Sequence, residues 1–361
     1  MRGTSQETRL MTRCAKLSDT INRMEGLPFP RKSDVGGCHT MKKLLHLICL
    51  FCVGPVALGS TTVSIKGTQW HINGKVTYPG TRAEGLLMNV RMVNSTFEDT
   101  KRADFDPNQN TSRFLVKIPE YYSYGVRAFT LNLQGGHPGY EGAVNSAFRP
   151  DGTLRTEYLS RIKRVIDECD KRGMVVILGL FYQRQDQILL DEQAVKRGVV
   201  NAVSWVRERG FTNVIIEIAN EYDHKGFDHD IIRTPKGQVE LIRLAKKTAP
   251  DLLVSTSGLG HGGMNDIIAK EADLILIHYN STKVEDIPSR FQALKKYGKP
   301  IVCNEDDKIG EEAARALQAC VENGGSWGFM HSKLNQYEPF EFNGYDDDHA
   351  VYDKFREMTG K

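Results

Sequence analysis

The chain has 361 residues, of which 40% are hydrophobic and 26% are charged. These proportions are typical of a soluble globular protein and exclude a disordered chain, a collagen and a multi-span membrane protein. The net charge of +3 is misleading, because residues 1–59 hold 9 basic and 4 acidic side chains and leave 39 basic and 41 acidic ones in the remainder. This nearly neutral remainder predicts no nucleic-acid partner.

Residues 41–59 have the pattern of a secretory signal peptide. Two lysines follow Met41, an apolar run of 15 residues covers Leu44–Leu58, and Ala57 and Gly59 are small residues that a signal peptidase accepts. The run is short for a membrane span, since about 1.5 Å per residue does not cross a hydrocarbon core of roughly 30 Å. We expect cleavage near Gly59, a secreted or periplasmic protein, and no stable membrane span after cleavage.

Residues 1–40 lack apolar periodicity and precede a methionine that begins a complete signal, so they are predicted to be an extension from a misplaced start codon. Residues 60–361 contain no composition break or Pro/Ser linker, which predicts a single domain. Only Cys169, Cys303 and Cys320 of the seven cysteines lie in that domain. Their odd number and wide spacing predict neither a disulfide framework nor a zinc site.

Eight short apolar runs predict β-strands that are buried on both faces. They are Leu86–Val93, Val126–Leu133, Val175–Phe181, Val214–Ala219, Leu252–Ser255, Leu274–Ile277, Ile301–Cys303 and Ser326–Met330. Segments with apolar residues three and four positions apart occupy six of the seven intervals, all except the one between the fifth and sixth strands, and each predicts one amphipathic helix. Alternating β and α segments with eight strands predict an α/β fold, a (β/α)8 (TIM) barrel, with an open doubly wound sheet as the alternative.

A short extended segment, Gln69–Thr81, precedes the first of these strands. It contains Asn73 and Gly74, and an Asn-Gly pair favours the tight turn of a two-residue β-hairpin. The sequence therefore predicts an N-terminal β-hairpin before the barrel.

Two of the predicted strands end in carboxylates, and the active sites of such barrels lie at the carboxyl ends of their strands. Asn220 and Glu221 follow the fourth strand, and Glu305 lies at the end of the seventh. Either glutamate alone would be read as an exposed loop acid. Two carboxylates that meet across a barrel mouth are what glycoside cleavage requires, one as an acid and one as a nucleophile or base.

From Trp70 to its end, the chain resembles the clan of retaining β-glycosidases with (β/α)8 barrels, and in particular its cellulase-like, glycoside hydrolase family 5-like members. The resemblance rests on the order and strand positions of the Asn-Glu pair and the later Glu, and on the segments INGK, FRPDGTL and ILGLFY. It implies that Glu221 is the general acid/base, that Asn220 binds the sugar 2-hydroxyl and that Glu305 is the nucleophile.

The same resemblance implies that Trp327 on the eighth strand is a platform on which a sugar stacks. His278 and Tyr279 at the sixth strand are candidates for substrate binding by the same resemblance. Family members often have His-x-Tyr there, with the Tyr in contact with the nucleophile, whereas the two residues are adjacent here. Adjacent residues of a strand point to opposite faces, so only one of the two can lie in the pocket unless the strand end bends.

Four further side chains are candidates for substrate binding. Arg91 is expected either beneath the nucleophile or in an ordinary core ion pair. Asn132 and Gln134 share one strand face and could hydrogen-bond sugar hydroxyls. Tyr182 is expected to form a pocket wall or to pack in the core.

Neither a cofactor nor a metal is predicted. The cluster of Asp223, His224, Asp228, His229 and Asp230 is read as a solvated loop, and a GxGxxG at Gly258 lacks the acid that a dinucleotide site needs. The predicted function is a secreted hydrolase that cleaves β-glycosidic bonds of a poly- or oligosaccharide by retaining double displacement. The alternative is a catalytically silent, carbohydrate-binding barrel.

Overall fold

The computed structural model describes residues 60–135, 145–337 and 340–361, all of which belong to one compact unit, Leu58–Lys361. The predicted N-terminal extension and signal peptide lie outside the described residues. Within the described part of the chain, we find no helix that is both long enough and apolar enough to span a membrane.

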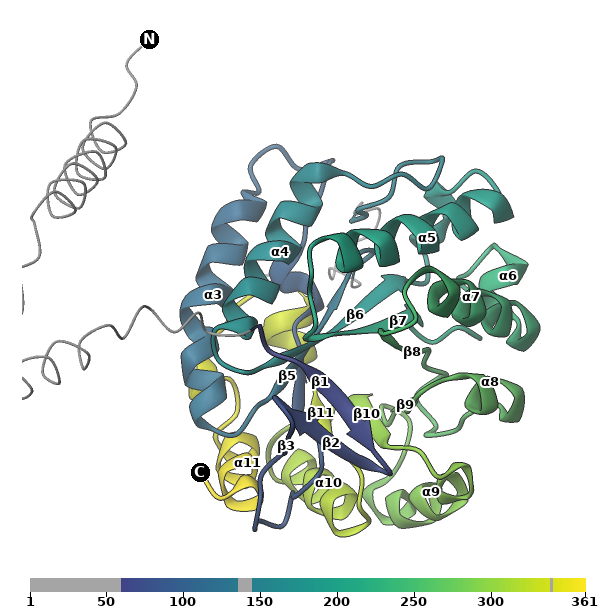
Figure 1. The fold of residues 1–361 in the computed structure, drawn as a ribbon. Coiled ribbons are helices and arrows are strands. Elements are labelled where there is room, and N and C mark those ends of the chain that lie inside the picture. The colour runs from purple at the N-terminus through teal and green to yellow at the C-terminus, as the bar shows by residue number, and fades with distance from the viewer. Residues whose placement is uncertain (1–59, 136–144, 338–339) are drawn as a thin grey trace, which may run out of the picture. The chain divides into compact units, whose positions relative to one another are not determined.

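Eight short parallel strands form the centre of the fold (Figure 1). Each overlaps one of the eight predicted apolar runs. They are β4 (Asn89–Arg91), β5 (Ala128–Asn132), β6 (Val175–Phe181), β7 (Val214–Ala219), β8 (Leu253–Ser255), β9 (Ile275–His278), β10 (Ile301–Glu305) and β11 (Gly328–Phe329).

The strands follow one another around a ring in chain order. Six are hydrogen-bonded in the order β11-β4-β5-β6-β7-β8, and β9 pairs with β10. Isolated parallel bridges join the two groups, Ser257 to Leu276 on one side, and Val302 to Ser326 and Asp306 to Phe329 on the other. A doubly wound sheet reverses its strand order at a switch point. The unreversed order confirms the (β/α)8 barrel and contradicts the open-sheet alternative.

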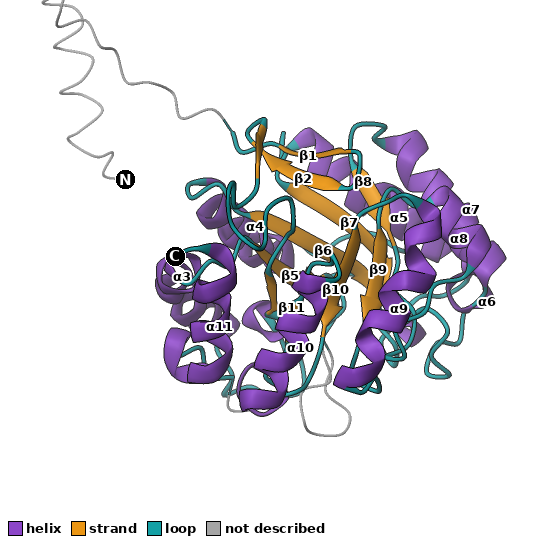
Figure 2. Cartoon of the chain, turned by 90° about the horizontal axis from the view of Figure 1, so that it is seen from below, coloured by secondary structure: helices purple, strands orange, loops and turns teal. Residues whose placement is uncertain are grey.

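Helices surround the strands, as Figures 1 and 2 show. They are α3 (Pro107–Ser123), α4 (Thr156–Asp170), α5 (Glu192–Glu208), α6 (Asp230–Arg233), α7 (Pro235–Thr248), α8 (Asp266–Glu271), α9 (Ile287–Leu294), α10 (Gly310–Glu322) and α11 (His349–Thr359). The start of α3 is capped: the Asp106 carboxylate accepts from two main-chain N–H groups, and Pro107 occupies the first turn. The apolar stripe of each helix then packs against the outer face of the strands.

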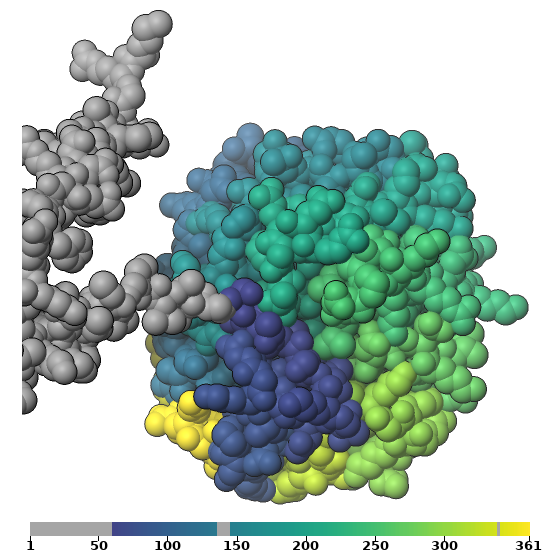
Figure 3. Space-filling model, in the orientation of Figure 1, coloured from purple at the N-terminus to yellow at the C-terminus, as the bar shows by residue number. Residues whose placement is uncertain are grey.

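The N-terminal segment forms an antiparallel sheet of β1 (Val63–Lys66), β2 (Gln69–Ile72) and β3 (Lys75–Val76). Positive φ angles at Asn73 (53°) and Gly74 (74°) make the turn between β2 and β3, which confirms the predicted hairpin. The additional strand β1 was not predicted, because its four residues are too few to show a period. This sheet lies on the face of the molecule seen in Figure 3.

Trp70 of β2 connects this sheet to the barrel. Its side chain is fully buried in an inner apolar cluster with residues that point into the ring from the strands, among them Ala128, Ile177 and Ile215. Because several of these residues lie at the amino-terminal ends of their strands, the sheet covers that end of the barrel. The carboxyl-terminal end is left for the polar side chains described next.

Candidate active site

Glu221 and Glu305 meet at the carboxyl-terminal end of the barrel. Glu221 follows β7, Glu305 is the last residue of β10, and both side chains are mostly buried. Oxygen atoms of the two carboxylates and a ring nitrogen of His278 lie within 4.8 Å of one another. Glu305 lines a cleft of about 360 Å³, a volume within the range of small-ligand pockets.

A β-bulge at Asn304 sets the direction of Glu305. Cys303 pairs with Ile277 and Glu305 pairs with His278, so Asn304 is an extra residue in β10. Strict alternation would place Asn304 and Glu305 on opposite faces, but the bulge lets both point into the barrel. There, Asn304 Nδ2 donates to a carboxylate oxygen of Glu217 over 3.2 Å.

The chain turns sharply at Glu221, which has a φ of 50°. This left-handed conformation is unfavourable for a residue other than glycine and is found most often where a functional side chain must be placed. The main-chain N–H of Glu221 donates to Ser257 Oγ over 3.1 Å, which fixes the turn to the strand next to β7.

Three groups surround the Glu305 carboxylate. Arg91 Nε lies 2.8 Å from one oxygen, Asn280 Nδ2 donates to the other over 2.5 Å, and His278 Nδ1 lies 3.7 Å from the first. Burial alone would raise the pKa of Glu305, but the charges of Arg91 and His278 and the hydrogen bond from Asn280 lower it below its ordinary value. Glu305 is therefore held ionised, which is the state a nucleophile requires.

Arg91 also organises the neighbouring residues. Its Nη2 donates to Asn220 Oδ1 over 2.6 Å, and Asn220 Nδ2 donates to Gln183 Oε1 over 3.0 Å. Of the two positions expected for Arg91, the structure has the one beneath Glu305. Asn220 is fully buried with both ends of its amide occupied, so contact with a sugar hydroxyl requires Gln183 to move aside.

His278 lies between the two carboxylates. Its Nδ1 is 3.3 Å from Glu221 Oε1, and its other ring nitrogen is buried without a hydrogen-bonding partner among the described residues. Burial lowers the pKa of His278, but the charges of Glu305 and Glu221 and the hydrogen bond with Glu221 together raise it above its ordinary value. The raised pKa favours the charged form of His278, which lies between the two acids.

Tyr279 does not lie in the pocket, which corrects one of the expected contacts. It is fully buried on the helix side, where its ring packs at 5.9 Å against Phe291 of α9. Asn280, two residues beyond His278, faces the cleft and binds Glu305 in its place. The two-residue period of a strand starting from His278 was the signal that could have identified Asn280.

Trp327 is not a sugar-stacking platform. It is fully buried, stacks on Phe329 and donates from Nε1 to Asp306 Oδ2 over 2.9 Å, on the helix side of the barrel. Trp327 and Phe329 share one face of the strand, and Met330, on the other face, reaches the cleft.

The remaining candidates divide between the cleft and the barrel interior. Tyr182 lines the cleft below the Arg91 guanidinium, whose carbon lies 5.9 Å from the ring centre. Gln134 is fully buried and supports the cleft: it accepts from the main-chain N–H of Tyr182 and donates to the carbonyl of Gln185. Asn132 is buried and is not among the lining residues, so both amides are corrected from sugar-binding to interior positions.

Several residues around the cleft were not identified from the sequence. Gln183 connects the two halves of the site, since its amide accepts from Asn220 and donates to Glu221 over 3.2 Å. Arg184, Asp307 and Tyr337 also line the cleft. All four lie in loops beyond strand ends, where no periodicity marks a residue as inward-facing.

Members of the Asp/His cluster after Glu221 contribute to loop structure, and His224 of this cluster also lines the cleft. His229 Nδ1 lies 2.8 Å from a carboxylate oxygen of Asp186, and Asp223 accepts from the main-chain N–H of Leu259. Among the described residues, the grouping with suitably close ligand atoms for a cation is Glu221, His278 and Glu305. Arg91 at 2.8 Å already supplies a positive charge to this group, which disfavours a second one.

No family model matches the sequence, and no curated protein matches it. Solved structures do. A protein of Bacteroides vulgatus aligns with 82% of this chain at 13% identity and a TM-score of 0.59. A broad-specificity GH5-4 endoglucanase from a Clostridium species (C. longisporum) aligns with 79% of this chain at 12% identity and a TM-score of 0.54.

An exo-β-1,4-mannosidase from Opitutaceae bacterium strain TAV5 aligns with 77% of this chain at 13% identity and a TM-score of 0.53. The alignments cover 99% of the endoglucanase but only 60% of the Bacteroides protein and of the mannosidase. The chain therefore has the barrel fold of glycoside hydrolases of the family 5 type, which agrees with the resemblance expected from its motifs.

Proposed function

We propose that this protein is a retaining β-glycoside hydrolase that acts on a β-linked oligo- or polysaccharide. The observation that carries the proposal is the approach of Glu221 and Glu305 to within 4.8 Å at the carboxyl-terminal end of the barrel. Retaining glycosidases place their two carboxyl groups about 5–5.5 Å apart, whereas inverting enzymes need roughly 6.5–9.5 Å to admit a water molecule. The shorter separation favours double displacement.

In the first step, Glu305 attacks the anomeric carbon, and the bond from that carbon to the leaving oxygen breaks as Glu221 donates its proton to the oxygen. In the second step, Glu221, now ionised, takes a proton from a water molecule. The water oxygen then displaces Glu305 from the anomeric carbon and regenerates both carboxyl groups. The Arg91 cation stabilises the ionised Glu305 before attack and after release.

The activities of the similar structures support a saccharide substrate, because an endoglucanase and a β-1,4-mannosidase share this fold. The cleft supplies amide, imidazole and guanidinium groups that can bind sugar hydroxyls, from Gln183, His224 and Arg184. Tyr182 and Tyr337 offer aromatic surface in the same cleft.

The test is hydrolysis of a panel of β-linked glycans and aryl β-glycosides by the wild type and two variants. Glu305→Ala should lower hydrolysis on the order of a millionfold, because no nucleophile remains. Glu221→Ala should lower it by roughly 10²- to 10⁴-fold. That defect should shrink on an aryl glycoside whose leaving group needs little protonation, and azide should yield a β-glycosyl azide.

The matched control is Glu285→Ala, a change of an exposed glutamate outside the cleft. This variant should hydrolyse each substrate at the wild-type rate. If Glu221→Ala lost activity equally on all substrates and azide gave no product, the acid/base assignment would be wrong. If the wild type bound glycans but hydrolysed none, the catalytically silent barrel would be the correct description.

We also propose that the protein is secreted after cleavage near Gly59. Support comes from the Lys-rich start, the short apolar run and the small residues of 41–59. N-terminal sequencing of the exported protein should begin near Ser60. An exported chain that retains Met41 would contradict the proposal.

A further inference from the structure

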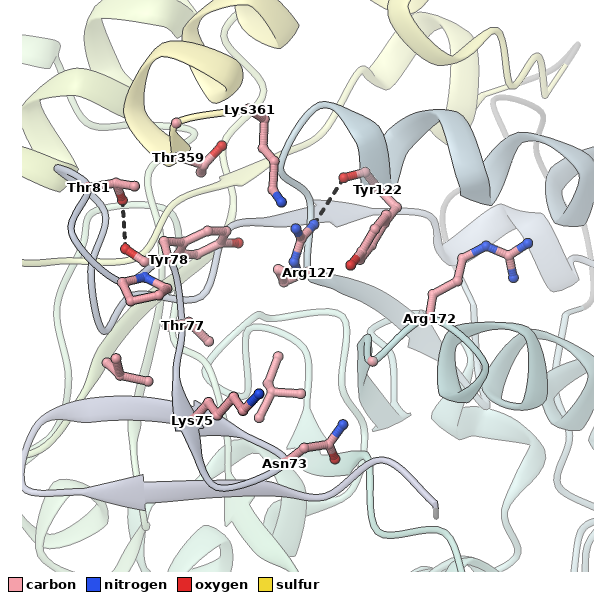
Figure 4. A pocket seen from close by; sticks show the side chains of 15 residues that line it. Asn73, Lys75, Thr77, Tyr78, Thr81, Tyr122, Arg127, Arg172, Thr359 and Lys361 are labelled. Atoms are coloured by element: carbon pink, nitrogen blue, oxygen red, sulfur yellow. Dashed lines mark hydrogen bonds between the residues drawn. The ribbon is translucent and has the colours of Figure 1, made fainter. Parts of the chain in front are cut away.

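A second cleft lies at the opposite end of the barrel from Glu305. Its volume is about 670 Å³, and it is bordered by the β2–β3 hairpin, the end of α3 and the chain at 359–361 (Figure 4). Arg127 directly precedes β5, and Arg172 directly precedes the turn into β6, so the cleft lies at the amino-terminal ends of the strands. The proposed hydrolysis uses none of its residues.

The lining of this cleft is strongly basic. It includes Lys75, Arg127, Arg172 and Lys361, and none of the described residues that line it is an aspartate or a glutamate. Arg172 is partly neutralised, because its Nη1 lies 2.5 Å from a carboxylate oxygen of Glu168. In the described part of the chain, the other three cations make no ion pair.

Arg127 is the central group of the cleft. It is only 8% exposed, and its guanidinium carbon lies 3.9 Å from the ring centre of Tyr122 and 5.6 Å from that of Tyr78. Its Nη1 donates to the carbonyl oxygens of Tyr122 and Val126. Nε and Nη2 have no hydrogen-bonding partner among the described residues, although a guanidinium has five N–H donors.

A buried cation without an opposite charge is unfavourable, and the two tyrosine rings and two carbonyls compensate only in part. The main-chain oxygen of Lys361 accepts from Arg356 Nε over 3.4 Å. Figure 4 shows the side chains of Lys75 and Lys361 on opposite sides of Arg127. Three unpaired cations thus surround one space.

We propose that this cleft binds a small ligand through an oxyanion, that is, a carboxylate, sulfate or phosphate group. Arg127 presents its two remaining nitrogens to the oxyanion, because the planar guanidinium matches two oxygens of such a group. Lys75 and Lys361 contribute flanking charge, and Tyr78 and Tyr122 form apolar walls for the rest of the ligand.

The test is calorimetric titration of the full chain with sulfate, phosphate and malonate at constant ionic strength, with uncharged malonamide as the comparison. Saturable binding of one anion per chain and no binding of malonamide are expected. The relative affinities show which group the natural ligand carries. Tighter binding of sulfate or phosphate indicates a tetrahedral group, and tighter binding of malonate indicates a carboxylate. Hydrolysis is not measured, so failure of the proposed glycosidase activity would leave this test unaffected.

Arg127→Gln should weaken anion binding at least about tenfold, as expected for loss of a hydrogen bond to a charged group. Because Arg127 also binds the end of α3, a second variant avoids a folding defect: Lys75→Gln combined with Lys361→Gln should weaken binding several-fold. Lys66→Gln, at the exposed last residue of β1 and outside the cleft, should leave anion binding unchanged. No saturable binding at millimolar anion, or binding that neither cleft variant weakens, would overturn the proposal.

Discussion

Arg91 Nε lies 2.8 Å from Glu305 Oε2, and the two residues are the last of β4 and of β10. Both side chains are almost completely buried. The same arginine binds Asn220 beside Glu221, so one cation connects both halves of the site. This arrangement makes the protonation of Glu305 depend on Arg91.

Arg91→Met should therefore move the acidic limb of the kcat/KM profile to higher pH. Burial raises the pKa of Glu305, and without the opposing charge of Arg91 the carboxylate will ionise only at higher pH. The free energy of unfolding should also fall by about 3–5 kcal/mol, because a buried carboxylate loses its partner. Activity-pH profiles and urea unfolding measure the two effects, and Arg91→Lys should restore part of both.

The matched control is Arg82→Met. Arg82 forms ion pairs with Glu322 and Glu357, but these side chains are each 48% exposed. Exposed pairs contribute about 0–1 kcal/mol, so this variant should have nearly wild-type stability and an unchanged pH profile. An unchanged acidic limb in Arg91→Met would show that Arg91 does not control Glu305.

Asn280→Ala should lower kcat/KM by roughly 10- to 100-fold, the equivalent of one hydrogen bond to a charged group. Asn280→Asp should have a further effect, because a second carboxylate beside Glu305 raises the pKa of Glu305 and moves the acidic limb upward. Steady-state kinetics across a pH series separates the loss of the hydrogen bond from the change in the pKa of Glu305. Asn323→Ala, which removes an amide bound to a carbonyl at the end of α10, should leave the kinetics unchanged.

His278→Asn should reduce stability in a pH-dependent way. The raised pKa of His278 means that its contribution is complete below the unfolded value of 6.5 and is lost as the pH rises through the folded pKa. The lowered pKa of Glu305 gives a contribution that is complete above 4.5 and is lost as the pH falls through the folded pKa. The stability difference between wild type and variant should therefore be largest between about pH 4.5 and 6.5.

Urea unfolding at a series of pH values measures this difference. His261→Asn, at an exposed histidine, is the control and should show no such maximum. A difference that stays constant from acid to alkaline pH would mean that His278 contributes through packing and not through charge.

Trp70→Ala should destabilise the fold by about 3–5 kcal/mol, the usual effect of removing a buried tryptophan. Because Trp70 lies at the end of the barrel opposite the carboxylates, kcat of the folded fraction should stay near that of the wild type. Trp205→Ala, at a half-buried residue that packs on Phe211, should lower the free energy of unfolding by less than Trp70→Ala does. Thermal unfolding and kinetics check both, and a large fall in kcat for Trp70→Ala would contradict the separation of the two ends.

The barrel could be predicted from the sequence because its strands are short apolar runs separated by amphipathic segments. Glu221 and Glu305 could be selected because a carboxylate that closes such a run is unusual. Trp327 and Tyr279 were assigned by residue type from the resemblance, and both point to the helix side. Strict alternation along the strand would have placed Met330 on the face opposite Trp327, toward the cleft.

Two features had no local signal. The bulge at Asn304 depends on pairing with β9, so a single strand sequence does not disclose that Glu305 turns inward. Gln183 reaches the site from a loop whose course depends on tertiary contacts, including the hydrogen bond from Asn220. Such loop residues are identified only when the whole fold is known.

The sheet that carries Trp70 determines where a long substrate can bind. Trp70 and the inner apolar cluster fill the ring, so the proposed polysaccharide substrate cannot thread through the barrel and must lie across its carboxyl-terminal rim. The entering chain and the departing fragments then share that rim, and residues of the loop segments 182–185 and 332–337 line the cleft there. The lengths and side chains of these two segments would decide how many sugar units the protein holds at once.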